Sequence, residues 1–335
     1  MHSILSPSSA HRWINCPGSV KLESSYPEEK NIYSEEGTKA HKYCHDYLTG
    51  QTTTAVSSEM KKACDVYIKY IKTFKSSAYE WISFEESYAQ KLIHPVMFGT
   101  PDCVIAQSLQ DIHVIDFKYG MGVVEAENNE QLLCYAAGVY EFLGRPENCR
   151  FYLTIVQPRA PHKNGSVRIW EITSETLKAF IENAKASAHL ALSSNATLRA
   201  GNHCQYCKAK KDCSAFKNKA YEASIVTPEF ESLSHELQYF KTSKKIIESR
   251  IDDLTKQIIA LLKNNTKVPL YELKQSMSRR KWSMDASEIF LIGEEYGIDL
   301  SAPVSPAEAE RLGMPYEIVN EMTIREKSEY RLEEI

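Results

Sequence analysis

Two acidic residues and a lysine lie in adjoining apolar segments between residues 96 and 118. Asp102 is in the first segment, and Asp116 and Lys118 are in the second. Both segments are rich in β-branched and aromatic residues, which predicts strands, and the short polar stretch between them predicts a hairpin. Asp116 and Lys118 are two residues apart, so they share one face of their strand. We expect Asp102 to converge on them.

Two carboxylates and an ammonium group in one pocket suit metal-assisted hydrolysis of a phosphodiester. Carboxylate oxygens bind Mg²⁺ or Mn²⁺, and a neighbouring lysine can orient water or neutralise developing charge. Taken alone, however, an Asp-x-Lys pattern is more typical of a surface ion pair on a hairpin.

Two further residues can supply metal ligands. His41 lies on the apolar stripe of the helix predicted for residues 33–48, where a histidine is more often a core residue than a ligand. Glu86 lies in the strand predicted for residues 80–89 and can reach a metal from there. Its neighbour Glu85 is also acidic, and one of the two can simply face solvent.

Gln131 and Tyr135 lie in the helix predicted for residues 128–143. They are four residues apart and therefore neighbours on one helix face. Taken alone, this spacing fits an amphipathic helix that carries one tyrosine in the core.

Together these residues resemble a nuclease signature. Pro101-Asp102 followed by Asp116-Phe117-Lys118 resembles the PD-(D/E)XK pattern. The segments Gly37-x-x-x-His41 and Gln131-x-x-x-Tyr135 are similar to two motifs of its RecB-like branch. The resemblance implies that Mg²⁺ or Mn²⁺ is held by His41, Asp102, Asp116 and the main-chain carbonyl of Phe117. It also implies that Lys118 positions the attacking water and that Gln131 and Tyr135 orient DNA.

The cysteines suggest a second site. The chain has nine, and Cys204, Cys207 and Cys213 form a compact half-cage that needs a fourth ligand. In RecB-like nucleases of the AddB and CRISPR-associated types, three such cysteines join one near the N-terminus around a [4Fe–4S] cluster. The resemblance assigns Cys16 as that ligand. Structural Zn²⁺ is the alternative, since it also accepts four thiolates. We expect the other five cysteines to lie in the core.

Apolar periodicity and the resemblance together predict the fold. The resemblance implies an α/β protein with a PD-(D/E)XK core, in which helices flank a mixed central sheet, and we place this nuclease domain at residues 1–222. Residues 223–335 should form a C-terminal extension. Within it we expect a long helix with a coiled-coil seam over 233–261, a small basic hairpin over 267–283, and then short helices with a charged tail.

Composition and charge limit the classes of partner and the cellular location that we expect. The net charge of −4 argues against a protein that coats nucleic acid along its whole surface, although a local basic groove is still allowed. No apolar run approaches the roughly 18 residues of a membrane span, and the N-terminal residues do not resemble a signal peptide. We therefore expect a protein of the bacterial cytoplasm without membrane contact.

The expected function follows from these motifs. The opening residues and the Glu35-Glu36-Gly37-Thr38 segment also resemble a phage or prophage family inferred to process DNA ends for recombination or repair. We expect a Mg²⁺- or Mn²⁺-dependent DNA exonuclease that works beside a single-strand annealing protein or recombinase. Helix 233–261 can pack on the nuclease core or on a second subunit. The alternative function is a DNA-binding or assembly module with a vestigial metal site.

Overall fold

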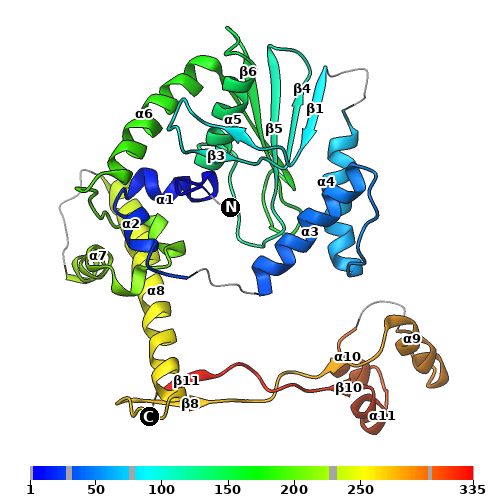
Figure 1. Cartoon of the computed structure of the whole chain (residues 1–335). Coiled ribbons are helices and arrows are strands. Elements are labelled where there is room, and N and C mark those ends of the chain that lie inside the picture. Colours follow the sequence, from blue (N-terminus) through cyan, green and yellow to red (C-terminus); the bar gives the residue numbers. More distant parts are fainter. Residues whose placement is uncertain (1–2, 28–31, 75–79, 226–231, 301–303, 335) are drawn as a thin grey trace. The chain divides into compact units, whose positions relative to one another are not determined.

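The chain forms two units. The computed structural model describes residues 3–27, 32–74, 80–225, 232–300 and 304–334. Tertiary contacts divide the chain into residues 1–249 and 250–335, and this boundary lies inside helix α8 (Leu233–Lys263). The boundary that the sequence predicts lies after residue 222. Figure 1 shows the elements of each unit.

A mixed five-stranded sheet forms the centre of the first unit. Its order is β1 (Trp81–Phe84), β4 (Cys103–Ala106), β5 (Asp111–Phe117), β6 (Arg150–Val156) and β7 (Val167–Thr173). Strands β4 and β5 form the predicted antiparallel hairpin, β5 and β6 run parallel, and β7 is antiparallel to β6. Strands β5 and β6 can run parallel because α5 (Glu130–Phe142) forms the crossover connection between them.

Helices cover both faces of this sheet (Figure 1). Helices α3 (Ile32–Leu48) and α4 (Ser58–Lys72) pack on one face, against residues such as Ile105 and Ile115. Helices α5 and α6 (Ser174–Leu192) cover the other face, against Val104 and Val114. Successive strand residues point to opposite faces, so each strand contributes to two cores. The expected α/β class, with a mixed sheet between helices, is confirmed.

The N-terminal segment packs beside α5 and α6. It comprises η1 (Pro7–Ser9), α1 (Ala10–Asn15) and α2 (Ser19–Glu23). The cysteine-rich segment that follows α6 contains η3 (Asn202–Tyr206), η4 (Lys210–Asp212) and α7 (Ser214–Ile225).

Two predicted strands are interrupted. The segment 80–89 divides into β1 and β2 (Tyr88–Ala89), because Glu85 adopts a left-handed conformation with φ 47°. The segment 96–106 divides into β3 (Phe98–Gly99) and β4, and Asp102 lies between them. Strand β2 pairs with β3, outside the central sheet.

The second unit has a different architecture from the one we predicted. The expected hairpin over 267–283 is wrong, because its two strands pair with the C-terminal segment. Strand β8 (Tyr271–Lys274) pairs with β11 (Arg331–Glu334), and β9 (Lys281–Trp282) pairs with β10 (Thr323–Ile324). Between β9 and β10 lie α9 (Ala286–Glu295), α10 (Pro306–Arg311) and α11 (Tyr316–Glu321), whose buried faces share one small core.

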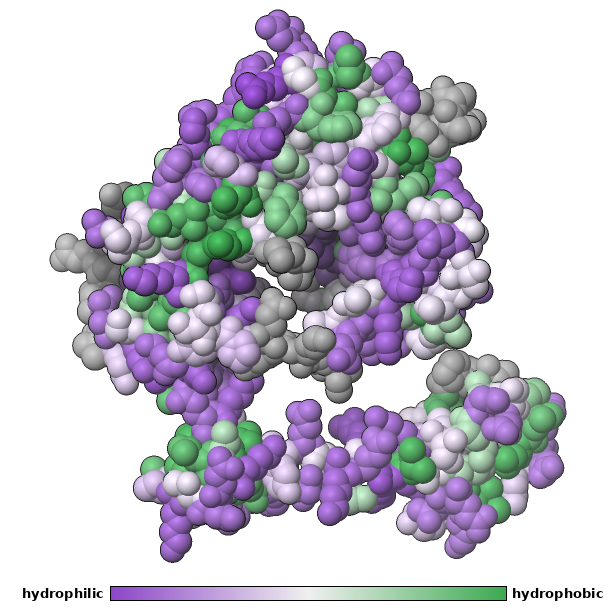
Figure 2. All heavy atoms as spheres, in the orientation of Figure 1, coloured by the Kyte–Doolittle hydropathy of each residue, from purple (hydrophilic) through white to green (hydrophobic). Residues whose placement is uncertain are grey.

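Helix α8 confirms the long helix, and much of its predicted seam is exposed. Leu233 is 84% exposed, and Leu237 and Phe240 are also exposed. Green hydrophobic surface is interspersed with purple polar surface across the visible face of the molecule (Figure 2). In the described part of the chain, no helix is long and apolar enough to cross a membrane.

Two helix glycines differ in the space around them, which predicts opposite effects on stability when each is replaced by alanine. Gly138 of α5 packs closely on β2, whereas the side-chain position of Gly37 in α3 is open among the described residues. A Cβ at Gly138 would lie 2.9 Å from Cβ of Tyr88 and 3.0 Å from Cγ of Gln90. Gly138→Ala should therefore destabilise the protein by about 1–3 kcal/mol through overpacking. At Gly37, in α3, a Cβ would meet no described atom within 4 Å, so Gly37→Ala should stabilise by about 0.5–1 kcal/mol. Denaturant unfolding measures both changes, and an unchanged Gly138→Ala variant would contradict this packing.

Candidate active site and four-cysteine site

Asp102 links α3 to strand β5. Its Oδ1 lies 2.9 Å from Nδ1 of His41, and its Oδ2 accepts a hydrogen bond of 2.6 Å from the backbone N–H of Phe117. The β4–β5 register pairs Cys103 with Ile115, so Asp102 comes to lie across from Asp116. The predicted convergence of the two acidic residues on this hairpin thus has its basis in strand register.

A candidate metal-binding group forms around Asp102. One ligand atom each from His41, Glu85 and Asp102 lies within 4.8 Å of the others. Phe117 lines the same pocket as these three residues. One imidazole and two carboxylates are a suitable donor set for Mn²⁺ or Mg²⁺, which prefer oxygen ligands.

Glu85, and not the predicted Glu86, belongs to this group. The backbone N–H of Glu85 donates to the carbonyl of Asp102 at 3.1 Å, which holds Glu85 beside the pocket. Glu86 instead accepts a hydrogen bond of 3.2 Å from the hydroxyl of Tyr88. The prediction placed Glu86 in a continuous strand, and the left-handed backbone at Glu85 interrupts that strand.

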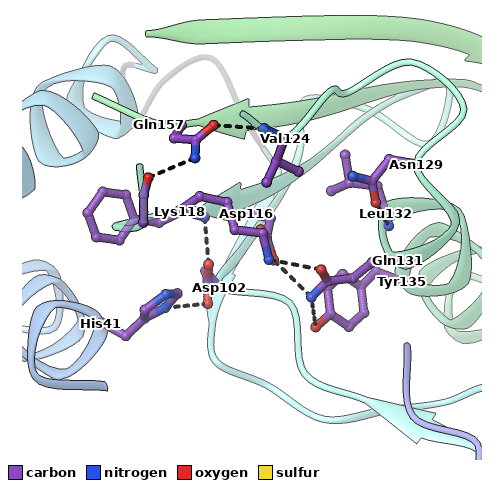
Figure 3. A network of polar contacts seen from close by, with 12 residues as sticks. His41, Asp102, Asp116, Lys118, Val124, Asn129, Gln131, Leu132, Tyr135 and Gln157 are labelled. Carbon is purple, nitrogen blue, oxygen red and sulfur yellow. Dashed lines mark hydrogen bonds and ion pairs between the residues drawn. The ribbon is translucent and has the colours of Figure 1, made fainter. Parts of the chain in front are cut away.

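Asp116, Lys118, Gln131 and Tyr135 form one connected network (Figure 3). The Nζ atom of Lys118 lies 2.8 Å from Oδ2 of Asp116 and donates to Oε1 of Gln131 at 2.8 Å. The side-chain amide of Gln131 donates to Asp116 at 3.3 Å and to the Tyr135 hydroxyl at 2.9 Å. The helix therefore brings the predicted Gln131 and Tyr135 to the predicted acid and lysine. The carboxylate of Asp116 is not a member of the His41 group.

Burial and charge pairing oppose each other in this network. Burial raises the pKa of Asp116, and the ammonium group of Lys118 offsets part of that rise. Burial lowers the pKa of Lys118, but the negative charge of Asp116 outweighs it, so the pKa lies above its usual value. Lys118 is therefore a cation at neutral pH and suits charge stabilisation better than proton abstraction.

His41 is also protonated in this arrangement. Burial lowers its pKa, but the charge of Asp102 and the hydrogen bond to it raise the pKa to about 9. Metal ligands must be deprotonated, so a metal ion that bound Nδ1 would displace a proton.

Gln157 is a structural residue that the sequence patterns did not single out. Its side chain is fully buried, and Nε2 donates to the carbonyls of Gly120 and Gly122, both at 2.8 Å. Its Oε1 accepts from the backbone N–H of Val124 at 3.0 Å and from Arg168 at 2.6 Å. These bonds hold the segment that follows Lys118. The sequence feature that could have identified Gln157 is a polar residue directly after the apolar strand β6.

The four predicted cluster ligands line one pocket. Cys16, Cys204, Cys207 and Cys213 share it, although Cys16 is far from the others in sequence. Backbone N–H groups donate to two of the sulfurs, from Arg199 to Cys16 at 3.3 Å and from Gly201 to Cys204 at 3.4 Å. Such donors stabilise thiolates, the form that binds iron or zinc.

Three of these thiols, those of Cys16, Cys204 and Cys207, are costly to ionise without a cation. Burial raises the pKa of Cys16 and Cys204, and it raises that of Cys207 to about 12. A bound cation would reverse this trend. The remaining five cysteines are buried, as we expected: Cys44, Cys64, Cys103, Cys134 and Cys149.

We predict that Gln157→Ala destabilises the protein by roughly 1–3 kcal/mol, because it removes the hydrogen bonds that the buried Gln157 makes to the backbone of Gly120, Gly122 and Val124. Gln51→Ala is the matched control: its side chain is exposed, and the change should stay within about 0.5 kcal/mol. Denaturant unfolding compares the two variants. Equal stability of both would show that Gln157 does not support the segment after Lys118.

Two comparisons place the chain among known proteins. The solved structure titled "Crystal structure of SSO0001" is similar at 15% sequence identity and a TM-score of 0.30, over 63% of this chain and 85% of that chain. A family profile described as "Protein of unknown function (DUF2800)" matches residues 2–301. Because this match spans most of the sequence, the chain belongs to the DUF2800 family.

Proposed function

We propose that this protein is a metal-dependent DNA exonuclease with a RecB-like PD-(D/E)XK core. The observation that carries the proposal is the meeting of two groups at the β4–β5 hairpin. His41, Glu85 and Asp102 lie close enough to share an ion. Asp116 of β5, Lys118 directly after it and Gln131 of α5 form a hydrogen-bonded network beside that group.

The donor set fits a divalent cation. His41, Asp102 and Glu85 would hold it, and Asp116 and the carbonyl of Phe117 are the further ligands that the RecB-like motifs suggest. When bound, Mg²⁺ or Mn²⁺ would lower the pKa of a water molecule and neutralise charge on the phosphate.

The protein's own groups have separate tasks in this proposal. Lys118 holds a positive charge beside the scissile phosphate, where it orients water and stabilises negative charge as the bond breaks. Gln131 restrains Lys118 through the hydrogen bond to Nζ and is itself held by the hydroxyl of Tyr135. Tyr135 is therefore a positioning residue. This restraint limits the positions that the ammonium group can adopt before substrate binds.

We further propose that the four cysteines hold a [4Fe–4S] cluster, with structural Zn²⁺ as the alternative. Either would join the N-terminal helices to the segment after α6 and would stabilise the folded state by linkage. The biological role we propose is processing of DNA ends in phage-type recombination or repair, beside a single-strand annealing protein or recombinase. The proposed cellular location is the bacterial cytoplasm.

The nuclease proposal is tested with end-labelled linear DNA and closed circular DNA, single- and double-stranded, in Mn²⁺. The wild-type protein should degrade linear DNA, and the label should show the polarity. Lys118→Ala should reduce cleavage by roughly 10²–10³-fold, because it removes charge stabilisation of the transition state. Lys61→Ala, at an exposed position in α4, is the matched control and should cleave like the wild type. An active Lys118→Ala variant would remove Lys118 from the mechanism. Binding without cleavage by the wild type would favour the non-catalytic module.

The cluster proposal is tested by metal analysis of protein purified without oxygen. A brown protein with about four iron atoms per chain is expected for [4Fe–4S], and a colourless zinc protein would decide for the alternative. Cys16→Ser should lose metal and unfold at a lower temperature, because one ligand is missing. Cys134→Ala is the control, since Cys134 is buried in the core and should leave the metal content unchanged. Full metal content in Cys16→Ser would exclude Cys16 as a ligand.

A further inference from the structure

The segment 119–129 must border the candidate active site. It begins directly after Lys118 and ends two residues before Gln131, and these two side chains are hydrogen-bonded at 2.8 Å. We call this segment the rim loop. Both of its ends therefore lie at the site, and its first residues directly follow Lys118.

The rim loop is held from beneath by buried polar groups. Besides the bonds from Gln157, Nε and Nη2 of Arg168 donate to the carbonyl of Val124 at 3.0 and 2.7 Å. Arg168 is only 4% exposed. The loop nevertheless presents apolar side chains to solvent, with Met121 64% and Val123 48% exposed. Met121 and Val123 thus offer apolar contact area on a loop whose backbone is held by Gln157 and Arg168.

Tyr206 reaches the same place from the four-cysteine segment. Its hydroxyl lies 4.0 Å from the position that a Cβ on Gly122 would occupy. Its side chain is 69% exposed. Tyr206 lies between Cys204 and Cys207, in the segment that carries three of the four cysteines. Met121, Val123 and Tyr206 together form what we call the mouth strip.

The charges beside the mouth strip favour a polyanion. Lys208, Lys210 and Lys211 follow Tyr206 in the chain. The neighbouring acid, Asp212, accepts a hydrogen bond from the hydroxyl of Tyr26. The ammonium group of Lys210 donates to the hydroxyl of Ser249, and that of Lys211 lies over the ring of Tyr26. An exposed aromatic ring in a lysine-rich segment is typical of single-stranded nucleic-acid binding, because bases stack on the ring while cations meet the phosphates.

We propose that Tyr206, supported by Met121, stacks on an unpaired base of the strand whose phosphate lies at the active site. This inference rests on the proposed nuclease function and adds a substrate class to it. A base inside a duplex is already stacked and paired on both sides. The mouth strip therefore selects single-stranded DNA or an end whose last bases have separated.

The test uses single-stranded oligonucleotides that carry 2-aminopurine at successive positions, with Ca²⁺ in place of Mn²⁺ so that binding is followed without cleavage. The fluorescence of 2-aminopurine falls when the base stacks on an aromatic ring. The wild-type protein should quench it at one or two adjacent positions. Tyr206→Ala should lose this quenching and bind roughly 5- to 100-fold more weakly, as expected for one stacked base.

Two control variants separate stacking from other effects. Tyr206→Phe retains the ring and should keep both quenching and affinity. Tyr221→Ala removes another exposed tyrosine, in α7, and should behave like the wild type. Because Tyr206 lies among the cysteines, the metal content of each variant is measured. If Tyr206→Ala loses metal, Met121→Ala decides, since it alters the strip from the rim loop and should weaken quenching and affinity by a smaller factor.

The outcomes distinguish this inference from the nuclease proposal. The stacking inference is overturned if the wild type shows no position-specific quenching. It is also overturned if quenching persists both in Tyr206→Ala with its metal retained and in Met121→Ala. DNA cleavage by the same wild-type preparation would leave the nuclease proposal intact in that case. Quenching that depends on Tyr206, in a protein that cleaves no DNA, would support the mouth strip and count against the nuclease.

Discussion

The buried carboxylate of Asp116 pairs with the half-buried ammonium group of Lys118 at the end of β5, and both groups take a further partner from outside the strand. Burying a charge is unfavourable unless the charge is paired and hydrogen-bonded. Asp116 and Lys118 pair with each other, and Gln131 of α5 bonds to both. The crossover helix is therefore fixed to the strand by polar contacts as well as by apolar packing. The need to pair and hydrogen-bond these charges therefore ties the end of β5 to α5, and with them both ends of the rim loop.

The two faces of the sheet contribute different parts of the site. Helix α3 packs on one face and supplies His41, whereas α5 packs on the opposite face and supplies Gln131 and Tyr135. The residues from the two helices come together because the strand register places Asp102 across from Asp116. The backbone N–H of Phe117 donates to Asp102, so even the strand backbone helps to hold the acid. A small shift in register would separate the groups from both helices.

The four-cysteine site has an architectural effect beyond its own ligands. It brings residues near the N-terminus against the segment after α6, where the backbone N–H of Gly18 also donates to Thr197 at 2.9 Å. The same segment carries Tyr206 to the rim loop. A metal or cluster bound there would restrain the mouth strip as well as the N-terminal helices. Cofactor loading and recognition of the DNA strand would then be coupled through one short segment.

The sequence by itself predicted most elements of the first unit and most of the residues that the structure brings together at the candidate site. Period-two and helical patterns predicted the β4–β5 hairpin, the flanking helices and the face shared by Gln131 and Tyr135, because these features depend on neighbours within a few residues. Burial of Asp116, together with its ion pair to Lys118, shows that this pair is not a surface feature of an isolated hairpin.

Only the tertiary structure decided the rest. The left-handed backbone at Glu85 selected Glu85 over Glu86, and a strand pattern does not contain that information. Strands β8 and β9 pair with strands about 60 and about 40 residues further along the chain, because a short strand specifies its pleat but not the strand with which it pairs. Gln157 and Tyr206 acquired their positions in the same way, through segments distant in sequence. Local physics determined the elements, whereas long-range burial and hydrogen bonding determined which of their residues meet.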